Sequence, residues 1–265
     1  MAVVSTFCKK GGVGKTTFIG FLAHYYSTLG KKVLVISVDD QNSIFKIFGK
    51  EDKIFEESDN YLEFLMANVV EMGDVLIEVR PNLYVIKTLN TDKLSMKLTL
   101  ERSQEKVIKK IISEYETYFD YVFIDFPPSS SRLTEVLLDI SDSIIIVVGL
   151  DSLGLNGFFN TIQYFVDNDI NLEQIKYIVP NGFSLNRRAP KISLDKLKEQ
   201  AAEFTPHAMV LPPLKDRSII KNLQADGVSV YDHPEDESKR MTAWDVSNRD
   251  LLRDELKEMF EEIKI

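Results

Sequence analysis

Seven consecutive residues have the composition of a phosphate-binding loop: Gly11, Gly12, Val13, Gly14, Lys15, Thr16 and Thr17. Glycines let backbone N–H groups approach phosphate oxygens closely, and a helix that starts at the loop adds the positive end of its dipole. In such a loop the lysine bridges the β- and γ-phosphates and the next hydroxyl contacts Mg²⁺. We therefore expect Lys15 to bind the phosphates of ATP and Thr16 to contact Mg²⁺. The alternative is a glycine-rich turn with a solvated lysine.

A second lysine, Lys10, stands immediately before the glycine pair. The resulting pattern, KGGxGKTT, resembles the deviant Walker A motif of the ParA/MinD family of ATPases. In that family the extra lysine reaches across an ATP-sandwich homodimer and touches the phosphates bound by the other subunit. The resemblance therefore implies dimerisation on ATP binding, with Lys10 acting in trans. The alternative is that Lys10, like Lys9, is a surface lysine.

Two aspartates follow apolar runs that predict strands. Asp39 follows residues 33–38, and Asp125 follows residues 121–124. Open α/β sheets bind ligands at the carboxyl ends of their strands, so both carboxylates are candidates for the hydrolytic site. The first segment resembles the family pattern VLLIDxDPQ and the second resembles YDYIIIDxPPS. The resemblance implies that Asp39 orients the catalytic water and that Asp125 holds Mg²⁺ through water.

The chain departs from these patterns at three places. Ser37 replaces the first aspartate of the family's segment, Asp40 replaces its proline, and residues 129–131 are all serine. The neighbouring carboxylates Asp39 and Asp40 can alter each other's protonation. We therefore expect hydrolysis to be slower or differently tuned than in typical members of the family.

The resemblance extends to the later part of the chain. Asn181 follows a predicted strand at the place where family members use an asparagine for adenine, and Pro212 lies in a segment that resembles the one closing over the base. The alternative is that both are turn residues at strand ends. Six basic residues are candidates for nonspecific DNA contacts, because each could neutralise a phosphate: Arg187, Arg188, Lys191, Lys215, Arg217 and Lys221. The alternative for each is a solvated surface charge.

Apolar periodicity predicts the elements that position these groups. A strand at 3–7, a helix at 16–29 and a strand at 33–38 form a βαβ unit around the phosphate loop. Further strands are expected at 84–86, 121–124, 143–148, 175–179 and 208–211, with helices at 103–118, 158–168 and 249–263. This order predicts a single-domain α/β fold over residues 1–265, with a doubly wound, mostly parallel sheet flanked by helices. Residues 49–105 are interpreted as a less regular insertion within that domain.

Composition restricts the class of protein. The chain has 265 residues, 44% hydrophobic and 28% charged, which is the balance of an ordinary globular protein. Its single cysteine, Cys8, supplies neither an intramolecular disulfide nor a metal cluster. Apolar runs fall short of a membrane span, and the N-terminal residues do not form a secretory signal. These features predict a cytoplasmic protein. The net charge of −9 argues against a dedicated, sequence-specific DNA reader.

Within the family, the chain resembles the plasmid and chromosome partition branch, called ParA. The C-terminal ELKEMFEEIKI is too acidic to favour binding to anionic lipid, so we expect no membrane partner. A single cysteine excludes the cluster of nitrogenase-type reductases. The resemblance implies an ATP dimer that binds DNA without sequence preference, associates with the nucleoid, and is stimulated by a centromere-binding adaptor protein. The alternatives are a positioning ATPase for a protein or polysaccharide machine, and a regulatory nucleotide switch with slow turnover.

Overall fold

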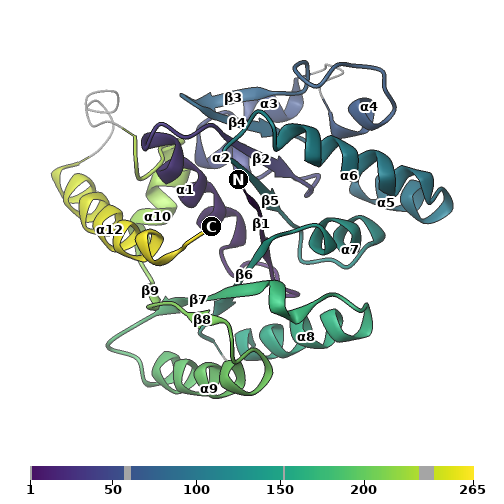
Figure 1. Ribbon diagram of the computed structural model, residues 1–265. Helices are drawn as coiled ribbons and strands as arrows, with labels where there is room; N and C mark the ends of the chain where they lie inside the picture. Colours follow the sequence, from purple (N-terminus) through teal and green to yellow (C-terminus); the bar gives the residue numbers. More distant parts are fainter. Residues whose placement is uncertain (1, 57–60, 152, 233–241) are drawn as a thin grey trace.

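The computed structural model describes residues 2–56, 61–151, 153–232 and 242–265, and a nine-stranded sheet forms its centre (Figure 1). The strand order is β3-β4-β2-β5-β1-β6-β7-β8, and β9 pairs with β7. Among the described strand pairs, β3–β4 is antiparallel and the others are parallel. The strands are β1 (Ala2–Phe7), β2 (Val33–Ser37), β3 (Ile77–Arg80), β4 (Leu83–Ile86), β5 (Tyr121–Asp125), β6 (Ser143–Gly149), β7 (Ile175–Phe183), β8 (Met209–Val210) and β9 (Leu214–Lys215).

Helices cover both faces of this sheet. In Figure 1, α1, α10 and α12 lie on one side of the central strands, and α5, α6 and α7 lie on the other. The longer helices are α1 (Lys15–Thr28), α5 (Thr91–Leu100), α6 (Ser103–Tyr115), α7 (Arg132–Asp139), α8 (Gly154–Asp167), α9 (Arg188–Phe204), α10 (Ser218–Asp226) and α12 (Ala243–Glu262). Short helices are α2 (Ile44–Ile47), α3 (Asp52–Phe55), α4 (Leu62–Met66) and the 3₁₀ turn η1 (Leu172–Gln174). The predicted doubly wound, mostly parallel sheet is confirmed.

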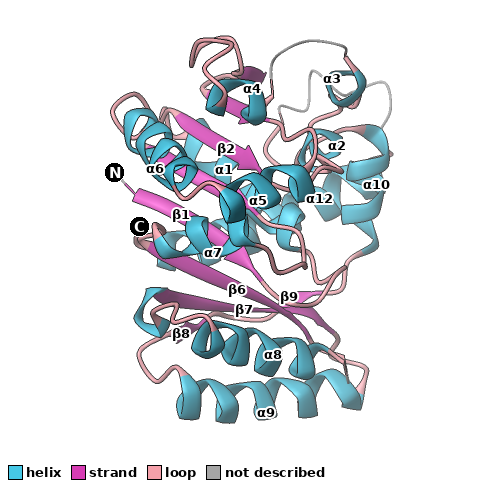
Figure 2. Cartoon of the chain, turned by 90° about the vertical axis from the view of Figure 1, so that its right-hand side faces the viewer, coloured by secondary structure: helices cyan, strands magenta, loops and turns pink. Residues whose placement is uncertain are grey.

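The central strands are apolar because both of their faces are covered. Every residue of β1 and β2 is buried, as are residues 143–148 of β6. Figure 2 shows these strands, in magenta, among the surrounding helices. A parallel strand between two helical layers must present apolar side chains to both, which is why these segments are rich in apolar residues. Directly after β1 and β2, Cys8 and Val38 are still buried, and the partly exposed Lys9 and Asp39 follow them.

Strand register brings the predicted site segments together. In the parallel pairs, Ser37 of β2 and Thr6 of β1 both lie opposite Asp125 of β5. The phosphate loop leaves β1 at this edge of the sheet, and the Asp39 segment leaves β2 beside it. The carboxyl ends of three neighbouring strands therefore meet at one place, as expected for a ligand site of an open α/β sheet.

Some elements differ from those that periodicity predicts. Residues 49–105 are more regular than we expected, because β4 pairs in parallel with β2 and β3 forms its antiparallel neighbour. Residues 57–60 of that segment lie outside the described residues. The last helix starts at Ala243, not at residue 249, because the Thr242 and Asp245 side chains form a capping box at its N-terminus. Helices α5, α7, α9 and α10 were missed altogether. The single-domain organisation stays a prediction.

Candidate nucleotide site

The phosphate loop connects β1 to α1 and takes the backbone shape that glycine permits. Gly12 and Gly14 have φ angles of 73° and 96°, in the left-handed region that residues with a Cβ rarely adopt. A Cβ on Gly14 would also stand 2.6 Å from Nδ2 of Asn181. Gly14 is the N-cap of α1, so the loop ends at the positive end of this helix, as an anion site requires.

Lys15 lies inside this loop. The residue is 6% exposed, and its Nζ donates to the carbonyl oxygens of Cys8 at 3.4 Å and of Lys10 at 3.3 Å. Burial lowers the pKa of Lys15, and the neighbouring Cys8 and Asp125 oppose that shift. A buried ammonium whose hydrogen bonds within the described residues go to backbone carbonyls gains strongly from an added anion, so the loop suits phosphate.

Asp125 lies under the loop and contacts Thr16. The Thr16 hydroxyl donates to Oδ1 of Asp125 at 3.1 Å, and the aspartate is 0% exposed. Burial raises the pKa of Asp125 to about 7, whereas the Thr16 hydrogen bond and Lys15 lower it. Its Oδ2 is buried and has no hydrogen-bond partner within the part of the chain that the structure describes. A hydroxyl beside a carboxylate with a free buried oxygen fits a hydrated Mg²⁺ ion, which prefers oxygen ligands and keeps several waters.

Asp39 lies in the turn that follows β2, next to the end of β5. It is half-buried, its Oδ1 accepts from the Gln41 backbone N–H at 3.0 Å, and its carbonyl accepts from the Ser37 hydroxyl at 3.2 Å. Asp40 is exposed, and its Oδ1 accepts from the Gln41 side chain at 3.2 Å. The two neighbouring carboxylates therefore accept from different groups of Gln41. Asp39 raises the pKa of both Lys15 and Asp125, so its charge acts on the phosphate-loop site.

Lys10 points out of the loop that encloses Lys15. Its Nζ donates to both carboxylate oxygens of Asp151, at 2.6 and 2.8 Å, and the Lys10 side chain is 23% exposed. Helix α8 packs closely against Lys10. A Cβ placed on Gly157 of this helix would stand 2.8 Å from the Lys10 Cβ. The Lys10 ammonium, more than any other neighbour, lowers the pKa of Asp151. The two lysines that the sequence singles out therefore have different partners: Lys15 contacts backbone carbonyls and Lys10 contacts the Asp151 carboxylate.

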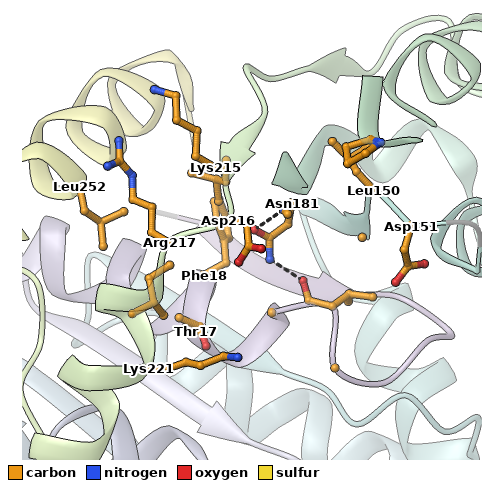
Figure 3. A pocket seen from close by; sticks show the side chains of 18 of the residues that line it. Thr17, Phe18, Leu150, Asp151, Asn181, Lys215, Asp216, Arg217, Lys221 and Leu252 are labelled. Atoms are coloured by element: carbon orange, nitrogen blue, oxygen red, sulfur yellow. Dashed lines mark hydrogen bonds between the residues drawn. The ribbon is translucent and has the colours of Figure 1, made fainter. Parts of the chain in front are cut away.

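A cavity of about 700 Å³ opens beside the phosphate loop (Figure 3). Figure 3 shows Asp151 and Leu150 at one end, Arg217 and Leu252 at the other, and Asn181 between them. Nδ2 of Asn181 donates to the Val13 carbonyl at 2.8 Å. The cavity lining includes five apolar side chains, Phe18, Leu214, Ile220, Leu252 and Leu256, together with charged ones such as Lys215 and Arg217. Apolar side chains in a cavity next to a phosphate loop suit the flat faces of a purine base.

One predicted base contact lies elsewhere. Pro212 is exposed and lies outside the described lining of this cavity, whereas Leu214, two residues later, is part of the lining. Strand β9 begins at Leu214 and pairs with the end of β7, which carries Asn181. The segment therefore approaches the cavity through β9, a two-residue strand too short to give a periodic signal in the sequence.

Comparison with known proteins identifies the family. A family model named AAA_31 and described as an AAA domain matches residues 1–175. Cell division protein PomZ of Myxococcus xanthus is 28% identical over 74% of this chain and 62% of its own length. The chromosome-partitioning ATPase Soj of Treponema pallidum is 28% identical over 58% of this chain and 60% of its own length. This chain belongs to the ParA/MinD family of P-loop ATPases.

Two further similarities cover nearly the whole of this ParA/MinD-family ATPase. Maintenance of carboxysome distribution protein A of Synechococcus elongatus is 27% identical over 87% of this chain and 92% of its own length. An ATP complex of McdA from Cyanothece has a TM-score of 0.77 at 20% identity and covers 100% of this chain and 98% of that one. The predicted family and ATPase activity are confirmed. P-loop ATPases act on ATP together with Mg²⁺, which agrees with the predicted cofactors.

The basic residues named as DNA contacts fall into two groups in this ATPase. Arg187, Lys215, Arg217 and Lys221 line the nucleotide cavity, whereas Arg188 and Lys191 are exposed on α9. Several of the first group are paired within the chain. Arg217 donates two hydrogen bonds to Glu255 of α12, Lys215 lies 3.5 Å from the same carboxylate, and Arg187 lies 3.8 Å from Asp216. Arg188 and Lys191 are the two candidates that lie outside the described lining of the cavity.

Sequence reasoning missed Asp151, Glu255 and Gln224. Gln224 of α10 donates to the Thr17 hydroxyl at 2.8 Å. Asp151 follows the end of β6, so the rule that drew attention to Asp39 and Asp125 would also have found it. Glu255 and Gln224 lie on helices far along the chain and carry no local signal. Among the described helices, none is both long enough and apolar enough to cross a membrane.

Proposed function

We propose that this ATPase forms an ATP-sandwich homodimer that binds DNA nonspecifically and segregates plasmid or chromosomal DNA together with a centromere-binding adaptor. The observation that supports this most directly is the difference between the partners of Lys15 and Lys10. Lys15 is buried and donates to backbone carbonyls of its own loop, whereas the partly exposed Lys10 lines the cavity and pairs with Asp151, whose side chain is 63% exposed. A partly exposed second lysine beside a phosphate site is available to the phosphates of a second subunit. In the cell we expect the dimer to associate with the nucleoid.

The residues of the site divide the work of ATP hydrolysis. Lys15 and the loop N–H groups bind the β- and γ-phosphates, and Thr16 and Asp125 hold the hydrated metal. Mg²⁺, when bound, offsets negative charge that develops on the phosphate oxygens. Asp39 orients a water whose oxygen attacks the γ-phosphorus, so that the bond to the β–γ bridging oxygen breaks and ADP and phosphate are formed. Lys10 of the other subunit adds positive charge to the same phosphates.

Exposed basic residues supply the proposed DNA contact. Arg188 and Lys191 lie within one turn of each other at the start of α9 and are both exposed. Dimerisation would double their number, and each phosphate neutralised adds to a salt-dependent affinity. A chain with a net charge of −9 gains little from the monomer alone. This arrangement supports DNA binding that depends on ATP.

A second candidate function is the positioning of a protein assembly and not of DNA cargo. This function is favoured by the share of each relative's length that the similarity covers. Maintenance of carboxysome distribution protein A of Synechococcus elongatus matches over 92% of its length, whereas the Treponema pallidum Soj protein matches over 60%. The two functions share the ATP dimer and its DNA surface and differ only in the adaptor. Identification of the adaptor's cargo separates them.

The test is retention of nonspecific duplex DNA at about 150 mM salt with ADP, ATP or a slowly hydrolysed ATP analogue. We expect wild type to bind with ATP and with the analogue, Lys10→Ala to lose binding, and Asp39→Ala to keep it for longer. Lys31→Ala, an exposed lysine beyond the C-terminus of α1, is the charge-matched control and should bind as wild type does. Equal retention in every nucleotide state, or none in any, contradicts the proposal. Phosphate release measured in parallel distinguishes a cycling ATPase from a slow switch.

A further inference from the structure

The turn that carries Asp39 is held in place by Asn42. Asn42 is 2% exposed and has a φ of 46°, in the left-handed region where asparagine is one of the few residues with a Cβ that is tolerated. Its backbone N–H donates to the Asp39 carbonyl at 2.8 Å, which closes the turn from residue 39 to residue 42. The Asp39 carboxylate accepts from Gln41 within the same turn. The direction of that carboxylate therefore depends on how the turn sits on the sheet.

The Asn42 side chain fastens this turn to a distant segment. Nδ2 donates to the Thr88 carbonyl at 2.8 Å and to the Asp40 carbonyl at 3.0 Å, and Oδ1 accepts from the Thr88 N–H at 3.2 Å. Both amide hydrogens and one lone pair are thus used in a buried place. The amide bridges the Asp39 turn and the connection between β4 and α5, which are 46 residues apart in the chain.

Thr88 is a firm anchor for this contact. It is 0% exposed, and its hydroxyl donates to the Ser37 carbonyl at 2.7 Å, directly before the Asp39 turn. The next two N–H groups along the chain, those of Leu89 and Asn90, donate to the Glu63 carboxylate at 2.8 to 3.0 Å. Because Thr88 is fixed on both sides, its backbone offers Asn42 a rigid pair of hydrogen-bonding groups.

We propose that Asn42 is a positioning residue for ATP hydrolysis, which holds the Asp39 turn against Thr88 so that the Asp39 carboxylate faces the attacking water. This inference rests on the water-orienting role proposed for Asp39. Misplacement of a catalytic group by about 1 Å can slow a reaction by about 100-fold. Loss of the Asn42 amide should therefore lower kcat, while the phosphate loop, and with it the affinity for ATP, stays intact.

Two substitutions distinguish the contribution of the Asn42 side-chain hydrogen bonds from that of its backbone conformation. Asn42→Gly adopts a φ of 46° without strain and removes all three side-chain hydrogen bonds. Asn42→Asp keeps an acceptor for the Thr88 N–H but places a buried carboxylate against the Thr88 and Asp40 carbonyl oxygens, so it is the harsher variant. Asn68→Gly is the matched control, because Asn68 also has a positive φ, of 57°, and lies exposed after α4. We expect kcat to fall by about 10- to 100-fold in Asn42→Gly, at least as much in Asn42→Asp, and not at all in Asn68→Gly. An ATP affinity within about twofold of wild type shows that each variant is folded.

A double-mutant cycle tests whether Asn42 acts through Asp39. Single-turnover hydrolysis is measured for Asp39→Ala with and without Asn42→Gly. We expect no further loss in the double variant, because the group that Asn42 positions is already absent. A further loss in the Asp39→Ala background, or an unchanged kcat in Asn42→Gly, would overturn the inference. An unchanged kcat in Asp39→Ala itself would instead contradict the role proposed for Asp39, so the two failures are distinguishable.

Discussion

A buried histidine predicts that the protein loses stability in mild acid. His24, on α1, is 4% exposed, and its Nδ1 lies 2.7 Å from the Ser229 hydroxyl. Its ring packs edge-on against Phe48 and Tyr231. Burial, which disfavours the charged imidazolium, lowers the pKa of His24 to about 4, and Asp232 opposes this shift only in part. The histidine is therefore neutral in the folded protein at pH 7.

The sign of the effect follows from which state binds the proton. Below the ordinary histidine pKa of 6.5 the unfolded chain takes up a proton, whereas folded His24 remains neutral until the pH approaches 4. The stability that neutral His24 contributes is thus fully present above pH 6.5 and is lost as the pH falls toward 4. At 1.36 kcal/mol for each unit of pKa, the difference between 6.5 and about 4 corresponds to about 3 kcal/mol. This is a large part of the 5–15 kcal/mol typical of a folded domain.

Urea unfolding between pH 7.5 and 4.5 measures this loss. His24→Asn retains an amide near Ser229 but cannot titrate, so it should be less stable than wild type at pH 7.5 and lose less stability on acidification. Because other groups titrate equally in both proteins, the difference between the two curves isolates His24 and should change by about 2 to 3 kcal/mol. His207→Asn, at an exposed position, serves as the control and should follow wild type. Parallel curves for wild type and His24→Asn would refute the reasoning.

Two ion pairs at the nucleotide cavity give further predictions. Asp151→Asn removes the charged partner that holds Lys10 in the monomer. Because a partly exposed ion pair contributes about 1 kcal/mol at most, the ATP concentration for half-maximal dimerisation should fall by up to about fivefold. Analytical ultracentrifugation at a series of ATP concentrations measures this midpoint. An unchanged midpoint would show that the pair does not restrain Lys10. Glu255→Gln weakens the charge-assisted bonds from Arg217 that join α12 to the lining of the cavity. We expect Glu255→Gln to lose about 1 to 2 kcal/mol of unfolding free energy and to release a fluorescent ATP analogue faster. The control Glu258→Gln, at an exposed position, should behave as wild type. Equal release rates in Glu255→Gln and Glu258→Gln would count against a role for Glu255.

Local sequence was sufficient to predict the elements at the centre of the candidate site. Gly14, Lys15 and Thr16 lie at the junction of one strand and one helix, and the apolar pattern of fewer than forty residues predicts both elements. Asp39 and Asp125 were predictable because parallel strands place their carboxyl ends at one edge of a sheet, so two separated aspartates could be assigned to one site. The departures at Ser37 and Asp40 could also be recognised from the sequence, by comparing these two residues with the family pattern.

Only the tertiary structure decided which groups face one another. The sequence marks Lys10 but carries no sign that Asp151 holds it, and it marks Arg217 as basic but not as the partner of Glu255. Asn42 and Thr88 were likewise unremarkable until the structure brought them into contact. Periodicity tells which face of an element is buried, because burial depends on side-chain type. It does not tell which distant side chain lies opposite, because that depends on how all the elements pack together.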